Sequence, residues 1–224
     1  MKEKDIPAFK SKLQLSGFEK PLQPTPKLHE FDGDNSFIVR KVENYQFEDK
    51  QFTTPEEVGL LLASLFNELR EKYGVDAPAS FVVAEDEHGE PSLYTLTEKI
   101  RKSGIATESL TENKRTVFAQ SIIELFESLI SYFEDKAESE ENFLCDIPTL
   151  DQFVYGTKEG EKTERWHLVD TDPYFTDRRE ALYGTVDTFL IELFEIQEKY
   201  NINLQDVINR AKDLMSSLDS EESK

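Results

Sequence analysis

The chain has 224 residues and a formal net charge of −20, from 46 acidic and 26 basic side chains. Its 38% hydrophobic and 11% aromatic residues are enough for a packed core, whereas its negative field disfavours nonspecific binding to nucleic acid or to a membrane of anionic lipid. No apolar run reaches the length of a membrane span, no signal peptide follows Met1, and the single cysteine excludes an intrachain disulfide, so we expect a cytoplasmic protein.

The N-terminal region predicts an extended arm followed by a β-hairpin. Residues 1–27 hold four prolines, which break regular structure, so we expect an arm there. Two runs typical of strands, at 28–31 and 36–42, flank a turn that contains Asp32 and Gly33. Asp-Gly between two such runs is a strong signal for a hairpin.

A helix and a second hairpin are expected next. Thr54 in a capping position, a proline in the first turn and Gly74 as a stop signal predict a helix over 55–73. Strand-like runs at 80–85 and 92–97 flank a polar turn, and this pattern predicts the second hairpin.

The second half of the chain predicts helices with a few short strands between them. The elements expected here are a polar connection at 99–112, a long helix at 113–135, strands at 142–145, 152–155 and 165–169, helices at 179–200 and 204–218, and a polar tail at 219–224. The last helix has one apolar face, which could close the core of this chain or dock on a partner. Four aromatic residues at helical spacing are expected to face the core: Phe126, Phe133, Phe189 and Phe194.

Four aspartates near the ends of predicted strands are candidates for chemistry. Asp146 and Asp151 lie in a loop between two apolar runs, and Asp170 and Asp172 follow the end of another. Carboxylates that converge repel one another unless a cation neutralises them, and Mg²⁺ prefers oxygen ligands. The alternative is that these aspartates cap turns, where aspartate is common.

The spacing and order of these elements resemble the protein-kinase-like superfamily, including its aminoglycoside-phosphotransferase branch. Asp146 stands where the family has its catalytic aspartate, and Asp151 stands at the asparagine of the same loop. The run Leu168-Val-Asp170-Thr-Asp172 resembles the metal-binding motif of the phosphotransferases. The resemblance implies that Asp146 acts as the base, that Asp151, Asp170 and Asp172 hold Mg²⁺, and that ATP is the phosphate donor.

The resemblance also implies an α+β fold of two lobes. Residues 28–98 would form a small N-lobe, with an antiparallel sheet and one helix, and residues 99–218 a mostly helical C-lobe. Arg40 or Lys41 would contact phosphates, and alternation along the strand allows only one of them to do so.

The helix at 55–73 would supply a glutamate that pairs with this arginine or lysine, and Glu57 and Glu68 are the candidates. Glu98 lies at the end of the second hairpin, where the chain would enter the hinge between the lobes. It would contact the nucleotide there.

Several departures from the family pattern leave two other interpretations open. The chain has no glycine-rich phosphate loop, and Asp151 replaces an asparagine. Leu144-Cys145 precedes Asp146, where the family has His-Arg or His-Gly. One alternative is therefore a catalytically inactive kinase-like module whose acidic surface binds a basic protein. The other is an unrelated α+β interaction domain, which two hairpins in separate sheets would favour.

His167 and Cys145 are better explained by packing than by catalysis. Free cysteine is usually buried, and no histidine lies near Cys145 in the sequence to activate it. Alternation along the strand at 165–169 places Trp166 and Leu168 on one face and His167 and Val169 on the other. We therefore expect His167 to be a packed side chain.

Overall fold

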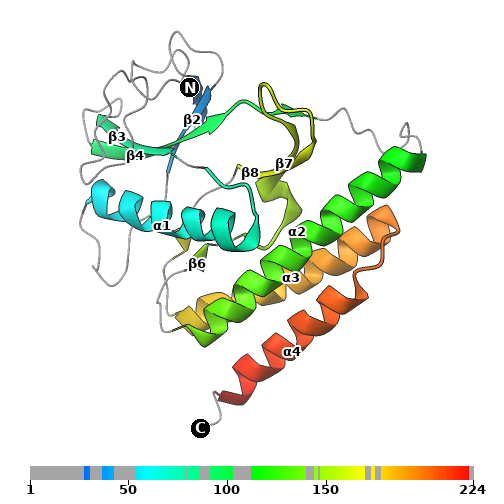
Figure 1. Cartoon of the computed structure of the whole chain (residues 1–224). Helices are drawn as coiled ribbons and strands as arrows, with labels where there is room; N and C mark the ends of the chain where they lie inside the picture. Colours follow the sequence, from blue (N-terminus) through cyan, green and yellow to red (C-terminus); the bar gives the residue numbers. More distant parts are fainter. Residues whose placement is uncertain are drawn as a thin grey trace.

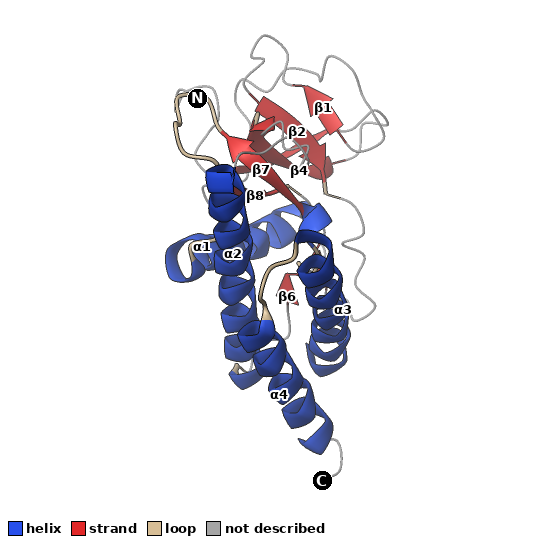
Figure 2. Ribbon diagram, turned by 90° about the vertical axis from the view of Figure 1, so that its right-hand side faces the viewer, coloured by secondary structure: helices blue, strands red, loops and turns tan. Residues whose placement is uncertain are grey.

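A computed structural model describes most of the chain, with some residues given by their backbone alone. The described residues are 28–30, 37–42, 54–78, 80–85, 91–102, 112–139, 144–145, 147–169, 173–174 and 178–221. Most strands gather at one end of the molecule, and three long helices lie towards the other end (Figure 2). This segregation of antiparallel strands and helices makes the fold α+β.

The two predicted hairpins lie in one antiparallel sheet of four strands. The strand order in this sheet is β1-β2-β4-β3. The strands are β1 (Leu28–Glu30), β2 (Phe37–Lys41), β3 (Ser80–Glu85) and β4 (Pro91–Glu98). Helix α1 (Pro55–Tyr73) crosses below this sheet and contacts β3 and β4 (Figure 1). The predicted turn at Asp32 and Gly33 lies outside the described residues.

The ends of α1 follow from its sequence. Thr54 and Glu57 form a capping box, in which the backbone N–H of each donates to the side chain of the other at 3.3 Å. The helix ends at Gly74, which has a φ of 70° in the left-handed region. A glycine adopts this conformation without the steric cost that a Cβ would bring, so both predicted ends of the helix are confirmed.

Two smaller sheets lie between the four-stranded sheet and the helices. One joins β5 (Arg101–Lys102), β7 (Phe153–Thr157) and β8 (Arg165–Leu168) in the order β5-β7-β8. The other pairs β6 (Leu144–Cys145) with β9 (Pro173–Tyr174). The prediction of an irregular connection over 99–112 is wrong at its start, because Arg101 and Lys102 pair with Thr157 and Gly156. This pairing depends on a residue far along the chain, and two charged residues carry no strand signal of their own.

Three helices lie side by side and enclose most of the core (Figure 2). They are α2 (Glu112–Glu138), α3 (Arg178–Tyr200) and α4 (Gln205–Glu221). The apolar residues of the last helix and the turn before it are buried: Leu204, Val207, Ile208, Ala211, Leu214 and Leu218. The apolar face of α4 therefore closes the core of this chain.

One aromatic residue departs from the expected core. Phe126, Phe133 and Phe189 are fully buried and stack edge to face, whereas Phe194 is 45% exposed. Five residues of a helix turn the side chain by about 140°, so Phe194 lies well away from the buried face that holds Phe189. The ammonium of Lys212 lies 5.3 Å from the centre of its ring. Among the described residues, no helix is both long enough and apolar enough to cross a membrane.

Candidate functional site

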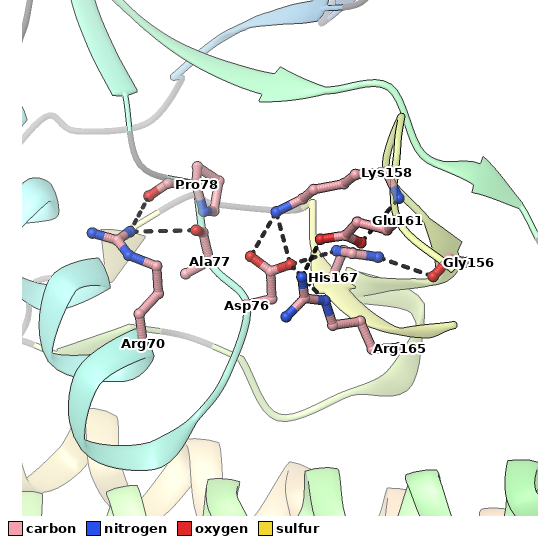
Figure 3. Close-up of polar contacts among 9 residues, drawn as sticks. All are labelled: Arg70, Asp76, Ala77, Pro78, Gly156, Lys158, Glu161, Arg165 and His167. Carbon is pink, nitrogen blue, oxygen red and sulfur yellow. Dashed lines mark hydrogen bonds and ion pairs between the residues drawn. The ribbon is translucent and has the colours of Figure 1, made fainter. Parts of the chain in front are cut away.

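The segment between α1 and β3 is attached to the end of β8. The backbone N–H of Leu168 donates to the carbonyl of Asp76 at 2.8 Å, and Asp76 forms a parallel bridge with His167. On the other side of the segment, the guanidinium of Arg70 donates to the carbonyls of Ala77 and Pro78 at 3.3 and 2.6 Å. Figure 3 shows the contacts of Arg70. Together with the hydrogen bond from Leu168, they fix the backbone at Asp76 and at the two residues after it.

The carboxylate of Asp76 is the centre of a buried polar cluster, which we call the Asp76 junction. The ammonium of Lys158 lies 2.7 Å from both carboxylate oxygens, and Nδ1 of His167 lies 2.7 Å from Oδ2 (Figure 3). Nε of Arg165 lies 3.5 Å from the same oxygen. The side chain of Asp76 is only 12% exposed. The junction therefore joins the segment between α1 and β3 to the β7–β8 hairpin through Lys158, Arg165 and His167.

The surroundings of Asp76 hold it in the charged form. Burial alone would raise the pKa of this carboxyl group, but hydrogen bonds from His167 and Lys158, and the charges of both, outweigh burial and lower the pKa to about 2. Asp76 is thus a carboxylate throughout the neutral range.

Both ring nitrogens of His167 lie next to oxygen atoms. The ring is 1% exposed, and its Nε2 lies 3.1 Å from the carbonyl oxygen of Gly156. A carbonyl oxygen and an ionised carboxylate are hydrogen-bond acceptors, so each ring nitrogen faces an acceptor. The prediction that it is a packed side chain is confirmed, and its burial depends on these two acceptors.

The turn between β7 and β8 is held by a second carboxylate. Glu161 accepts a hydrogen bond from the backbone N–H of Lys158 at 3.2 Å and forms an ion pair with Arg165. These contacts lower the pKa of Glu161 against the opposing effect of burial. Because Lys158 and Arg165 also contact Asp76, the conformation of the turn and the junction depend on each other.

Helix α1 is also attached to α2 by polar contacts. The ammonium of Lys136, which is 5% exposed, lies 2.8 Å from Oε2 of Glu68. The hydroxyl of Tyr73 donates to Asp135 at 2.5 Å. Burial, followed by the hydrogen bond to Asp135, raises the pKa of Tyr73 to about 12. Both contacts fix the orientation of α1 relative to the helices below it.

The structure describes only part of the predicted catalytic site. Asp146, Asp170 and Asp172 lie outside the described residues. Asp151 is exposed, and its carboxylate accepts a hydrogen bond from the hydroxyl of Thr149. That contact is typical of an aspartate in a turn, and the metal-binding role of Asp151 stays a prediction.

Of the residues predicted to contact the nucleotide, two are described by their backbone alone. Arg40 and Lys41 are described as positions in β2, opposite Thr95 and Tyr94 of β4. Glu98 is exposed at the end of β4. Glu68 contacts Lys136 of α2, and no contact among the described residues joins it to another predicted site residue.

A groove lies beside the Asp76 junction, with a volume of about 390 Å³. It runs between β5 with its preceding residues and the turn from β7 to β8. Its lining residues are Lys99, Ile100, Arg101, Thr157, Lys158, Glu159, Gly160 and Glu161. Lys158 and Glu161 belong to both the groove and the polar contacts shown in Figure 3.

Reasoning from the sequence did not predict the Asp76 junction or the groove. Asp76 lies in a short segment between Gly74 and Pro78, for which the sequence predicts no element. Its partner His167 is 91 residues away in the chain, and no local pattern predicts such a pairing. The sequence predicts only that His167 is packed, and a buried imidazole requires hydrogen-bond partners.

Comparison with known proteins gives no relative. No protein-family model matches this chain, and neither a curated protein nor a solved structure does so. Within the part of the chain that the structure describes, no three histidine, cysteine or acidic side chains are grouped as metal ligands. The function is therefore argued from the geometry of the chain.

Proposed function

We propose that this protein is a kinase-like phosphotransferase that uses ATP and Mg²⁺ and acts on an acceptor not yet known. The observation that carries the proposal is the pairing of the strands that flank the four aspartates. Cys145 pairs with Pro173 in one sheet, and Phe153 pairs with Leu168 in another. The backbone N–H of Val169 also donates to the carbonyl of Gln152 at 2.9 Å.

These pairings bear directly on the predicted catalytic residues. Asp146 follows Cys145, and Asp172 precedes Pro173, so covalent connectivity ties both aspartates to one strand pair. Asp151 precedes Gln152, and Asp170 follows Val169, at the residues joined by the backbone hydrogen bond. Consecutive Cα atoms are about 3.8 Å apart, so each of the four aspartates is within one residue of a position in these two pairings, as a shared cleft would require.

The remaining elements also support the proposal. The strand with the candidate basic residues, β2, pairs with β4, which ends at Glu98. Helix α1 packs on the same sheet, and α2 precedes β6 and the loop with Asp146. The two hairpins share one sheet, which counts against an unrelated fold with two separate hairpins.

The register of β2 and β4 favours Arg40 over Lys41 as the phosphate-contacting base. Leu93 of β4 belongs to the core under the sheet, and Thr95 lies two residues on, on the same face. Arg40 occupies the position opposite Thr95, whereas Lys41 is opposite Tyr94 on the other face. Leu93 shares its core cluster with Val58 and Leu62 of α1, so we infer that α1 lies on this face, and in the proposed fold this helix supplies the glutamate that pairs with the basic side chain.

The proposed roles follow the chemistry of each group. Asp146 would orient and deprotonate the acceptor hydroxyl, and Arg40 would neutralise charge on the phosphates. Asp151, Asp170 and Asp172 offer carboxylate oxygens, the donor type that Mg²⁺ prefers, and would hold the ion. The bound ion would neutralise negative charge on the transferred phosphate, and the chain would supply positioning and electrostatic stabilisation.

One observation favours the alternative of a catalytically inactive kinase-like module. Both candidate glutamates of α1 have contacts elsewhere, because Glu57 caps the helix and Glu68 binds Lys136. An active kinase needs such a glutamate to pair with the base. In this alternative the acidic surface of the protein would bind a basic protein partner.

The two functions differ in their response to nucleotide. The experiment measures the thermal unfolding midpoint with ATP and Mg²⁺, with ATP and EDTA, and without ligand. A ligand at 100 times its dissociation constant stabilises the folded state by about 2.7 kcal/mol. We expect a rise in the midpoint that requires Mg²⁺, is lost in Asp170→Ala and is kept in Asp187→Ala, an exposed aspartate of α3. No rise at millimolar ATP would overturn the proposal and favour the inactive module.

A further inference from the structure

The groove beside the Asp76 junction has the size and charge of a site for a small anionic ligand. Its volume of about 390 Å³ falls in the range of small-molecule sites, roughly 300–1,000 Å³. Its lining includes three basic side chains, Lys99, Arg101 and Lys158. Two acidic side chains, Glu159 and Glu161, line it as well, so in a chain whose net charge is −20 the groove combines basic and acidic groups.

One end of the groove offers donors that suit a phosphate group. Arg101 and Thr157 are directly opposite each other in the β5–β7 pair, so their side chains lie on the same face. Both residues line the groove, and Arg101 is exposed. A guanidinium can bind a phosphate with two parallel hydrogen bonds, and the threonine hydroxyl can add a third.

The backbone at this end is held rigidly. A Cβ added to Gly156 would lie 2.3 Å from the carbonyl oxygen of Arg101, so β5 and β7 approach each other as closely as a glycine permits. The carbonyl of Gly156 also accepts the hydrogen bond of the buried His167. Arg101 therefore projects from a strand whose position is set by the Asp76 junction, and little backbone ordering would be needed on binding.

The other end of the groove offers acceptors. Glu159 and Glu161 line it from the turn between β7 and β8, and Gly160 between them has a φ of 83° with open space beside it. Lys158 contributes less positive charge than its position suggests, because its ammonium is bound to Asp76. Carboxylates at this end would accept hydrogen bonds from hydroxyl groups and would repel a second anionic group.

We propose that this groove binds a small phosphorylated compound that carries hydroxyl groups, with its phosphate on Arg101 and Thr157 and its hydroxyls towards Glu159 and Glu161. Asp151, the aspartate of the proposed nucleotide cleft that lies within the described residues, does not line the groove, and the test below treats the two sites as separate. Binding would stabilise the β5–β7 pairing and the turn that carries Lys158, and through Lys158 it would affect the Asp76 junction.

The test uses a hexose 6-phosphate as the probe, with the uncharged hexose and inorganic phosphate as comparisons. Binding to the full chain is measured by titration calorimetry at low salt, and the amide NMR signals of Arg101 and Gly160 locate the site. The key variant is Arg101→Gln. Its matched control is Lys114→Gln, which removes an exposed positive charge from α2 at a residue that is not part of the groove lining.

We expect the hexose phosphate to bind and to bind more tightly than either comparison compound. Loss of one charge-assisted, bidentate contact should weaken binding about tenfold in Arg101→Gln, while Lys114→Gln keeps the wild-type affinity. Asp170→Ala should also keep it, which separates this site from the nucleotide cleft.

Three results would overturn the proposal. The first is equal affinity of the wild type and a folded Arg101→Gln, which would show that the phosphate binds elsewhere. The second is loss of binding in Asp170→Ala, which would place the ligand in the nucleotide cleft. The third is equal affinity for inorganic phosphate, which would show that the acidic end contributes no recognition of hydroxyl groups.

Discussion

Replacing Asp76 with asparagine should destabilise the fold, because the junction depends on a charged carboxylate. The change keeps the shape of the side chain but removes its charge, and it puts an NH₂ donor among cations that need acceptors. The pKa of Asp76 falls from 3.8 to about 2 in the folded protein. At about 1.4 kcal/mol for each pKa unit, the charged form contributes about 2 kcal/mol of stability.

The expected loss for Asp76→Asn is larger than this contribution. Removing one partner from a buried ion pair costs about 3–5 kcal/mol, because it leaves an uncompensated charge. Asp76 is 12% exposed and Arg165 is 53% exposed, so water can compensate in part. We therefore expect a loss of about 3 kcal/mol, measured as the difference in the free energy of unfolding in urea at pH 7.

The pH dependence provides an independent check. A carboxyl group with a lowered pKa stabilises the folded state above its unfolded pKa, and this contribution is lost as the pH falls through the folded value. For Asp76 the window runs from about pH 4 down to about pH 2. The difference between the wild type and Asp76→Asn should therefore shrink across this window.

The control for Asp76→Asn is Asp187→Asn, which removes an exposed carboxylate from α3 and should change the stability by less than about 0.5 kcal/mol. A loss of that size in Asp76→Asn at pH 7 would refute the reasoning, as would a difference from the wild type that stays constant down to pH 2.

Three further substitutions test other contacts, each by urea unfolding. Tyr73→Phe removes the hydrogen bond to Asp135 and should cost about 1 kcal/mol; because the raised pKa of Tyr73 stabilises the neutral phenol, the loss should persist at pH 7 to 10 and disappear above about pH 12. Gly156→Ala places a Cβ against the carbonyl of Arg101 and should cost at least about 2 kcal/mol, whereas Gly184→Ala, in open space on a helix, should stabilise by up to about 1 kcal/mol. Lys136→Met leaves Glu68, 31% exposed, without this ammonium and should cost about 2 kcal/mol; no change would show that the buried ammonium contributes nothing net.

Much of the fold could be predicted because its signals are local. The cap at Thr54, the stop at Gly74 and the apolar stripe between them define α1 without reference to the rest of the chain. The elements that were missed depend on distant partners. β5 is a strand because Arg101 pairs with Thr157, and nothing in Arg101-Lys102 itself predicts this.

The candidate site also combines a local sequence signal with contacts between distant residues. The pattern of aspartates around 146–151 and 170–172 is a local signal and led to the proposed cleft. The Asp76 junction is a contact between side chains that are 91 residues apart, and its members are common residue types in unremarkable local contexts. Phe194 shows a related limit, because helical spacing identifies apolar positions but does not say how wide a face the neighbouring helices cover.

The long chain segment that the Asp76 junction closes has a consequence for the order of folding. The entropy lost in closing a loop rises with its length, so a contact across 91 residues is unfavourable until the elements between have formed. Helix α1 and the hairpins can form from nearby residues, and the junction then joins them. A contact made after the transition state acts on the unfolding rate more than on the folding rate. Asp76 would therefore set how long the folded protein persists, and it would have little influence on how fast the protein folds.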